Sequence, residues 1–321
     1  LHAYIDLHME MFLEKGKETY RPAGGLARIA TLFQSIRKQY PHQVLALDNG
    51  DTFHGTFPAV QSKGEALVAM INALHFDAMT AHWEFAYGPK HFEHLASQLQ
   101  HPMLAINVYD ELTNERIFPP YSIVKRADLK IGIIGIAEHI VDKTMPSHFS
   151  EGIYFTMGNE ELPTVIQQLR HEENVDIIVL LSHFGFPQEV KLAQEVDGID
   201  ILLSGHTHNR MAKPVVVNDT IIFQSGCHGA FIGRLDIEVE HDKIKHFTYE
   251  LIEVAETIIP DPPMQKRIDD TIRPNKTKLN EIIGHTEVPL HRYAQLETTM
   301  DNLLLASLLH PTKADVAFSN G

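Results

Sequence analysis

An α/β fold with a largely parallel sheet is predicted by two observations on the order of apolar segments. Short, nearly continuous apolar runs alternate along the chain with segments whose apolar residues recur every three or four positions. Continuous runs are typical of strands covered on both faces, and the wider spacing is typical of helices with one apolar face. The runs predicted as strands are residues 44–47, 131–136, 177–181, 199–203 and 220–223.

Helices are predicted before and between these strands, and the pattern changes after residue 230. Apolar and polar residues alternate over 232–239 and 244–252, which predicts an antiparallel pair of half-exposed strands around a turn at 240–242. The apolar faces of the three clearest helices are formed by Leu26, Ile29, Phe33 and Ile36, by Leu67, Met70, Ile71 and Leu74, and by Leu162, Val165, Ile166 and Leu169.

The segment Pro260-Asp261-Pro262-Pro263 interrupts this pattern and predicts a domain boundary. We therefore expect a first domain over residues 1–258, a helical linker over 259–283 and the beginning of a second domain over 284–321. The chain ends at Ser319-Asn320-Gly321 without a helix cap or turn, so we expect that the second domain is incomplete.

Composition excludes several classes of function. The net charge of −15 argues against nucleic acid as the main partner, although bound metal ions could still attract a small phosphorylated substrate. No apolar stretch approaches the roughly 18 residues of a membrane span, so we expect no membrane insertion. The single Cys227 excludes a disulfide framework and a thiolate zinc site. The chain opens at Leu1 inside a predicted strand, so its natural N-terminus is expected to be missing; the compartment stays open, with cytoplasmic slightly favoured over extracellular.

Four segments place imidazole or carboxylate side chains at the ends of predicted strands. In open α/β sheets, ligands bind at the carboxyl ends of the strands, so these side chains are candidates for one common site. Each segment alone has a simpler explanation as a turn or a hydrogen-bonded histidine, but the coincidence of all four favours a metal centre. The segments are Tyr4-Ile5-Asp6-Leu7-His8, Leu47-Asp48-Asn49-Gly50-Asp51, Leu180-Leu181-Ser182-His183 and Ser204-Gly205-His206-Thr207-His208.

This ordered set of motifs resembles the calcineurin-like metallophosphoesterases. Residues 24–30, 226–233 and 314–321 resemble the 5′-nucleotidase branch of that family, and the resemblance covers essentially the whole chain. It implies a four-layer α/β/β/α sandwich, followed by a helical linker and a nucleotide-binding C-terminal domain.

The resemblance also implies a centre of two divalent metal ions between the sheets. One ion would be held by Asp6, His8 and His208, and the other by His183 and His206, with Asp51 bridging both. Imidazole and carboxylate ligands suit Mn, Zn, Fe, Co or Ni and do not select among them. In such centres a hydroxide that bridges the two ions attacks the phosphorus in line.

The chain departs from the family at the Gly-Asn-His-Glu block, where it carries Ala81-His82-Trp83-Glu84. His82 stands at the position of the asparagine ligand and can bind the same ion. Trp83 replaces the catalytic histidine, and Ala86 replaces its aspartate partner. An indole N–H cannot serve as a general acid near neutral pH. His54, three residues after Asp51, is a candidate substitute acid, and a plain turn role for it is the alternative.

These motifs predict a dinuclear metal-dependent hydrolase of phosphoric ester or anhydride bonds, of the 5′-nucleotidase type, with a nucleotide as substrate. The block His82-Trp83-Glu84-Phe85 also resembles the thiosulfohydrolases of sulfur oxidation, so hydrolysis of a sulfur ester is an alternative. A catalytically weak metal-binding homologue is the third possibility, because a metal site can be purely structural.

Overall fold

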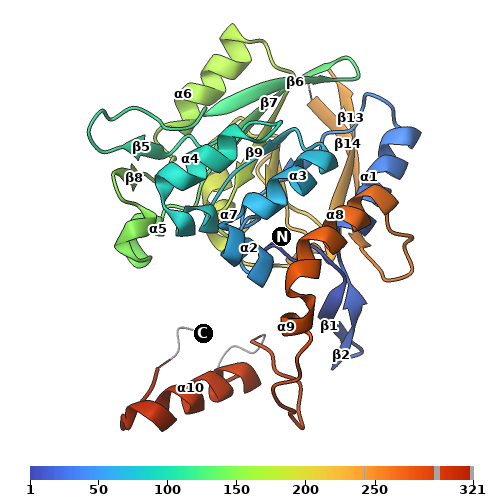
Figure 1. The fold of residues 1–321 in the computed structure, drawn as a ribbon. Helices are drawn as coiled ribbons and strands as arrows, with labels where there is room; N and C mark the ends of the chain where they lie inside the picture. Colours follow the sequence, from blue (N-terminus) through green and yellow to red (C-terminus); the bar gives the residue numbers. More distant parts are fainter. Residues whose placement is uncertain (242, 293–296, 319–321) are drawn as a thin grey trace. The chain divides into compact units, whose positions relative to one another are not determined.

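The largest sheet of the protein, shown in the computed structural model of Figure 1, has six strands in the order β11-β12-β10-β9-β7-β6. Its four middle strands are parallel, and the edge strands β11 and β6 are antiparallel to their neighbours. The structure describes residues 1–241, 243–292 and 297–318. The strands of this sheet are β6 (Tyr121–Arg126), β7 (Leu129–Ile136), β9 (Ile177–Ser182), β10 (Ile201–Leu203), β11 (Val215–Val217) and β12 (Thr220–Phe223).

The middle strands are apolar along most of their length because both faces of the sheet are covered. In β9, Ile178 and Leu180 pack against α6 (Leu162–Gln167) and α7 (Phe186–Glu195). The intervening Val179 and Leu181 point to the opposite face, where they meet a second layer of strands. A continuous apolar run therefore forms a strand with both faces buried, as the sequence predicts.

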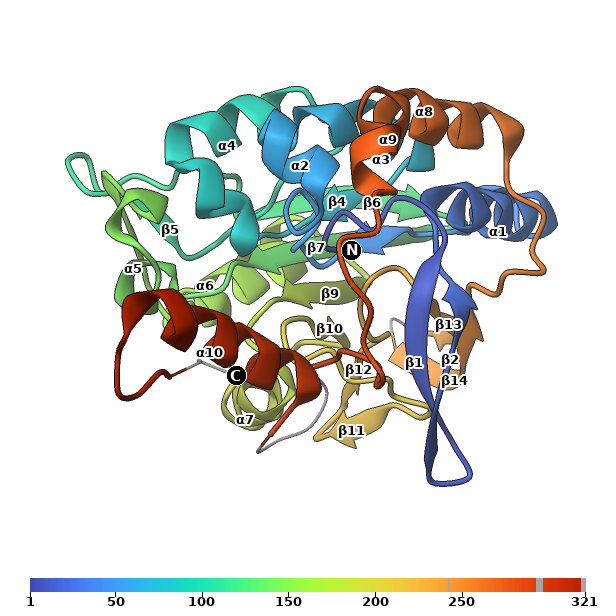
Figure 2. The same ribbon diagram turned by 60° about the horizontal axis from the view of Figure 1, so that its bottom comes forward.

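The second layer of strands consists of two pairs, β3 (Leu47–Asp48) with β4 (Ala78–Met79) and β13 (Phe231–Glu240) with β14 (Lys243–Glu253). Helices cover the outer side of this layer, whereas α6 and α7 lie on the far side of the main sheet (Figure 2). The order of layers is the predicted α/β/β/α sandwich. The outer helices are α1 (Leu26–Gln39), α2 (Phe57–Ser62), α3 (Glu65–Leu74), α4 (Pro89–Ser97) and α8 (Pro262–Ile272).

Smaller elements complete this part of the chain. A hairpin of β1 (His8–Glu14) and β2 (Lys17–Ala23) follows the N-terminal residues. The short strands β5 (Val108–Asp110) and β8 (Ile153–Phe155) pair with each other, and α5 (Val141–Thr144) follows β7. None of the helices in the described ranges is both long and apolar enough to cross a lipid bilayer.

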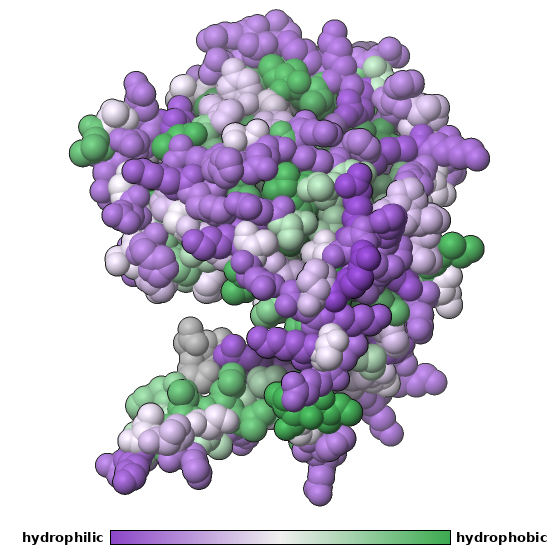
Figure 3. All heavy atoms as spheres, in the orientation of Figure 1, coloured by the Kyte–Doolittle hydropathy of each residue, from purple (hydrophilic) through white to green (hydrophobic). Residues whose placement is uncertain are grey.

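The contacts divide the chain into two units, Leu1–Ile272 and Arg273–Gly321. Met264 and Ile268 of α8 are buried in the core of the first unit, so the first half of the predicted linker packs with that unit. The second unit contains α9 (Lys276–Leu279) and α10 (Thr299–Thr312). Hydrophobic side chains gather over α10 (Figure 3), with Leu303, Leu304 and Leu308 exposed. The three-part domain division stays a prediction, and the motif residues Ser319, Asn320 and Gly321 lie outside the described residues.

Most predicted elements are confirmed. The runs at 131–136, 177–181 and 220–223 form β7, β9 and β12, and the alternating segments form the antiparallel pair β13 and β14. The run at 44–47 is strand only at Leu47–Asp48, because Val44 and Ala46 bond to the side chains of Arg126 and Asp77 instead of to a neighbouring strand.

Candidate metal centre

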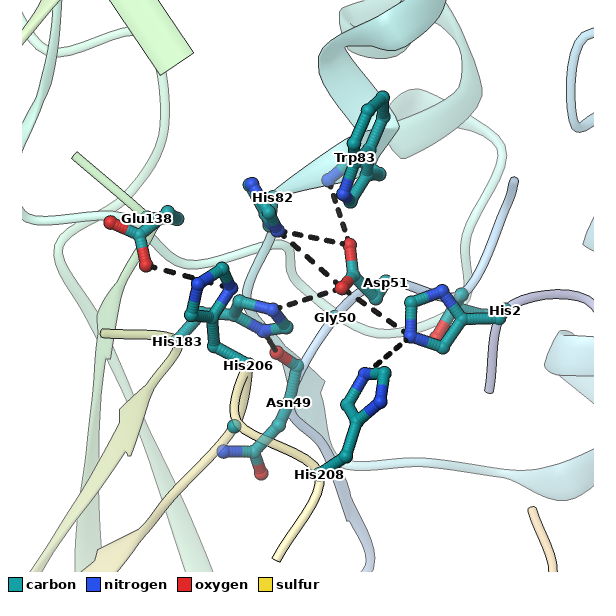
Figure 4. A network of polar contacts seen from close by, with 12 residues as sticks. His2, Asn49, Gly50, Asp51, His82, Trp83, Glu138, His183, His206 and His208 are labelled. Carbon is teal, nitrogen blue, oxygen red and sulfur yellow. Dashed lines mark hydrogen bonds and ion pairs between the residues drawn. The ribbon is translucent and has the colours of Figure 1, made fainter. Parts of the chain in front are cut away.

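The ends of four strands position the candidate ligands. Asp51 follows β3, His82 follows β4, His183 follows β9 directly, and the segment with His206 and His208 follows β10. In Figure 4 these side chains converge on one region around Asp51. β3 and β4 are parallel in the second layer, and β9 and β10 are parallel in the main sheet, so each layer brings two carboxyl ends to this region and residues far apart in sequence meet here.

Asp51 is the centre of this cluster. Its carboxylate is buried, and its Oδ2 lies 3.1 Å from Nε2 of His183. Nδ1 of His82 lies 3.3 Å from Oδ1, which also accepts the backbone N–H of Trp83 at 2.9 Å. Burial alone would raise the pKa of Asp51, but the charge and the hydrogen bond of His183 hold this pKa well below its usual value. The carboxylate is therefore ionised at neutral pH and surrounded by nitrogen donors.

Glu84 fixes the backbone around this carboxylate. It is fully buried and accepts N–H groups from Asp51 at 3.2 Å, Thr52 at 2.6 Å and His82 at 2.7 Å. These bonds join the loop after β3 to the 3₁₀ turn at Trp83–Tyr87. One carboxylate thus sets the separation of Asp51 and His82.

The histidines His82, His183 and His206 form a first group, with one ring nitrogen of each within 4.8 Å of the others. Nδ1 of His183 donates to the carbonyl of Asn49 at 2.5 Å, which directs its Nε2 toward Asp51. Burial lowers the pKa of His183, but the charge of Asp51 outweighs this effect and raises the pKa to about 9. At neutral pH the ring therefore carries a proton on Nε2, and a bound cation would replace that proton. Burial lowers the pKa of His206 to about 4, which leaves that ring neutral with a free lone pair.

The donor set fits divalent metal ions. Nε2 of His82 is buried and lacks a hydrogen-bond partner among the described residues, an arrangement that a bound cation would satisfy. Imidazole nitrogens and an ionised carboxylate are ligands that Mn, Fe, Co, Ni and Zn all accept. Asp51, His82, His183 and His206 could hold one ion.

A second group contains His2, Asp51 and His208, which suits a second ion on the other side of Asp51. Nε2 of His2 lies 2.9 Å from Nε2 of His208 and 3.5 Å from Oδ2 of Asp51. Burial lowers the pKa of His208 to about 4, so this ring is also neutral at physiological pH. The position of His2 here was not foreseen, because His2 lies outside the four segments that carry the predicted ligands.

Asp6 and His8 are placed differently from the other predicted ligands. The Oδ1 atom of Asp6 accepts the backbone N–H of Leu7, and His8 lies in a third group with Glu10 and His228. Glu10 is held by Arg210 and lies 3.0 Å from Nδ1 of His228 and 3.3 Å from Nε2 of His8. The structure therefore does not bring Asp6 and His8 to Asp51, and their role as ligands stays a prediction.

His54 and Trp83 lie together beside Asp51. Their rings stack with centroids 5.0 Å apart and an angle of 26° between the ring planes. Nε2 of His54 is 3.5 Å from Oδ1 of Asp51 and 3.0 Å from Nδ1 of His2. The indole also packs edge-on against Phe149. The residue at the position of the missing catalytic histidine thus contacts the proposed substitute acid.

Glu138 is a residue of the site that the sequence analysis missed. It follows β7 by two residues and is almost completely buried, and its Oε2 lies 3.8 Å from Nδ1 of His206 (Figure 4). Burial raises the pKa of Glu138, but the hydrogen bond with His139 and the charges of His206 and His82 outweigh this effect and keep the pKa below its usual value. The signal was available, because Glu138 follows the predicted strand at 131–136 in the same way that the predicted ligands follow theirs.

A cavity of about 550 Å³ adjoins the centre. Asp51, His183, His206 and His208 contribute to its polar wall, and Leu1 and His2 line it as well. The remaining wall is largely apolar and comes from α1, β9 and β13, among others. The cavity therefore connects the cluster of ligands to the space between the two layers of strands.

The chain belongs to the calcineurin-like phosphoesterase family, whose model matches residues 6–210. Among its relatives is the trifunctional nucleotide phosphoesterase YfkN of Bacillus subtilis, which is 25% identical over 95% of this chain and 24% of its own length. The 5′-nucleotidase of Bos taurus is 30% identical over 68% of this chain and 42% of its own length. The two relatives place the chain with the 5′-nucleotidase branch.

A solved structure with a similar fold is the sulfate thiohydrolase SoxB of Thermus thermophilus. It has a TM-score of 0.86 and 26% sequence identity, and the match covers 90% of this chain and 54% of that one. The chain thus spans about half, or less, of the length of these three proteins.

Proposed function

We propose that this chain is the metal-binding part of a metal-dependent hydrolase of the 5′-nucleotidase type, which cleaves a phosphoric ester or anhydride bond of a nucleotide. The observation that carries the proposal is the environment of Asp51, a buried ionised carboxylate with imidazole nitrogens on two sides. The names of YfkN and the bovine 5′-nucleotidase support nucleotides as the substrate class.

Two divalent ions at these positions would bind the phosphoryl oxygens and lower the pKa of a water molecule that serves as nucleophile. Asp51 would contact both ions. His82, His183 and His206 would hold one of them, and His208 the other, with the remaining ligands drawn from His2 or from the predicted pair Asp6 and His8.

We assign the proton donor for the leaving group to His54. Its ring is half-buried and lies beside Asp51, close enough to reach an atom bound at the centre. Trp83 stacks on the ring and cannot donate a proton itself near neutral pH, so its role is to hold the orientation of His54.

A hydrolysis panel on the full-length protein tests this proposal. The substrates are nucleoside mono- and diphosphates, nucleotide sugars, an aryl phosphate and a cysteine peptide with a thiosulfonate group, each with Mn²⁺, with Zn²⁺ and after chelation. We expect metal-dependent release of phosphate from at least one nucleotide. His183→Ala removes a candidate metal ligand next to Asp51. We expect it to lower the rate of hydrolysis by about 100-fold or more.

The matched control is His246→Ala, since His246 is exposed on β14 and should leave the rate unchanged. Metal binding without turnover of any substrate would instead support a catalytically weak metal-binding homologue. No metal binding at all would contradict the proposal.

Hydrolysis of a sulfur ester is a second candidate function. It is favoured by Trp83 at the position of the family's histidine, together with the 26% identity to SoxB over 90% of this chain. A thiolate-type sulfur departs without a general acid, so a centre that lacks the His–Asp pair suits such a substrate. Turnover of the thiosulfonate peptide with little turnover of nucleotides would select this candidate.

A further inference from the structure

Glu138 is a buried carboxylate whose two oxygens have different surroundings. Oε1 accepts the backbone N–H groups of His139 at 2.9 Å and Ile140 at 3.3 Å, which holds the side chain in one orientation. The backbone N–H of Glu138 itself donates to the carbonyl of Ala81, one residue before His82. The residue is therefore anchored to the same loop that carries one of the candidate ligands.

Oε2 points toward the metal centre. It lies 3.8 Å from Nδ1 of His206, a distance that a small rotation of the imidazole or one bridging water molecule closes. Glu138 has only about 1% of its surface exposed, so its charge is not screened by bulk solvent. Nδ1 of His139 lies 2.9 Å from Oε1, on the side of the backbone donors, whereas the ring nitrogen that faces Oε2 is Nδ1 of His206.

We propose that Glu138 is a positioning residue for the metal centre: it accepts a hydrogen bond from Nδ1 of His206 and so keeps the Nε2 lone pair of that ring free for a metal ion. The inference rests on the proposed metal-dependent function. Histidine ligands commonly donate their second N–H to a carboxylate or carbonyl, which fixes the tautomer and the orientation of the ring. His183 already has such a partner in the carbonyl of Asn49, and Glu138 gives His206 the equivalent.

Glu138→Gln is the decisive variant. The glutamine oxygen can still accept the two backbone N–H groups, but its NH₂ group would face Nδ1 of His206 and donate to it. The proton of the ring would then sit on Nε2 and block metal binding. We expect the affinity for Mn²⁺ or Zn²⁺, measured by calorimetry on the full-length protein, to fall by about 10- to 100-fold.

The tautomer provides a readout that a merely structural role would not change. In chelator-treated protein, the ¹⁵N shifts of His206, assigned with His206→Gln, should report an Nδ1–H ring in the wild type and an Nε2–H ring in Glu138→Gln. Asp142→Asn is the matched control, because it removes the same charge from the same segment but its carboxylate accepts from Phe155 N–H. It should change neither the tautomer nor the affinity.

Each outcome decides the proposal. An unchanged His206 tautomer in Glu138→Gln, with or without a loss of affinity, would overturn it. If Glu138→Gln does not fold, Glu138→Asp retains the charge but withdraws the carboxylate by one methylene, and it should weaken metal binding in the same direction; full affinity there would also overturn the proposal. If the wild type binds no metal, the proposed function fails, while the tautomer still tests Glu138.

Discussion

Gly50 determines the backbone path that brings Asp51 into the centre. Its φ of +89° lies in the left-handed region, and a Cβ atom added there would lie 2.8 Å from the carbonyl oxygen of Thr80 and 3.0 Å from Cα of Ala81. Asp51 follows at φ +56°, a conformation that costs a non-glycine residue about 1 kcal/mol or more. Two consecutive residues in this region explain why the loop needs glycine at the first position.

Gly50→Ala should therefore destabilise the protein and weaken metal binding together. We expect a loss of more than about 1 kcal/mol in the free energy of unfolding, measured by urea titration, because strain and close contact add. Gly152→Ala is the control: its φ is +80°, but no atom lies within 4 Å of the added Cβ. Equal losses in the two variants would show that the contact with Thr80 is unimportant.

His54 is the residue on which the proposed proton transfer depends. His54→Ala should lower kcat on a nucleoside monophosphate by roughly 100-fold, since the alkoxide leaving group needs a proton. On an aryl phosphate, whose leaving group departs readily, the decrease should be less than about 10-fold. Steady-state kinetics on both substrates, with His246→Ala as control, test this. An equal decrease on both substrates would exclude His54 as the acid.

At the scale of elements, the 3₁₀ turn at Trp83–Tyr87 and the loop after β3 behave as one unit because Glu84 bonds to both. The sequence places the family's glutamate here but does not show that its partners include Asp51 and Thr52. Both partners follow the end of β3, Asp51 lying 33 residues and Thr52 32 residues before Glu84 in the sequence.

Glu84→Ala should be strongly destabilising, because three buried N–H groups would lose their acceptor. We expect a loss of about 3 kcal/mol or more in the free energy of unfolding, given roughly 1–3 kcal/mol for each unsatisfied buried donor. Urea titration in the presence of a chelator measures this effect without the contribution of metal. Glu93→Ala, at an exposed position on α4, serves as the control and should change stability little. A similar small change in Glu84→Ala would contradict the anchoring role.

At the scale of the whole molecule, buried His101 links stability to pH. Both of its ring nitrogens are buried without a hydrogen-bond partner among the described residues, and burial lowers its pKa to about 4. The unfolded chain binds a proton near pH 6.5, whereas the folded protein does not until about pH 4. The stabilising contribution is therefore complete above pH 6.5 and is lost as the pH falls toward 4.

Urea titrations between pH 4 and pH 7 in chelator should show this loss, which amounts to at most about 3 kcal/mol for a shift of this size. His101→Leu removes one of the groups that titrate in this range, since burial also lowers the pKa of His206 and His208 to about 4, and it should reduce the slope of the curve by the share of His101. His94→Leu, which replaces an exposed histidine on α4, is the control variant, and its stability curve should match that of the wild type. An unchanged slope in His101→Leu would exclude His101 as the source.

Local sequence determined the elements and most of the site. The apolar runs of β7, β9 and β12 are continuous because both of their faces are buried, and that requirement is visible in the residues themselves. Asp51, His183, His206 and His208 could be predicted together because each follows the end of a predicted strand, whereas His82 was predicted only from the resemblance to the family's Gly-Asn-His-Glu block. The structure brings all five to one region.

Tertiary structure alone decided the contacts that depend on where distant segments pack. His8 lies with Glu10 and His228 and not with Asp51, and Glu10 in turn pairs with Arg210, 200 residues later. His2 takes the place beside Asp51 instead, and Glu138 reaches His206 only because β7 and β10 both lie beside β9. Periodicity reports which face of an element is buried, but not which side chain of another element meets it, because that depends on the packing of the whole sandwich.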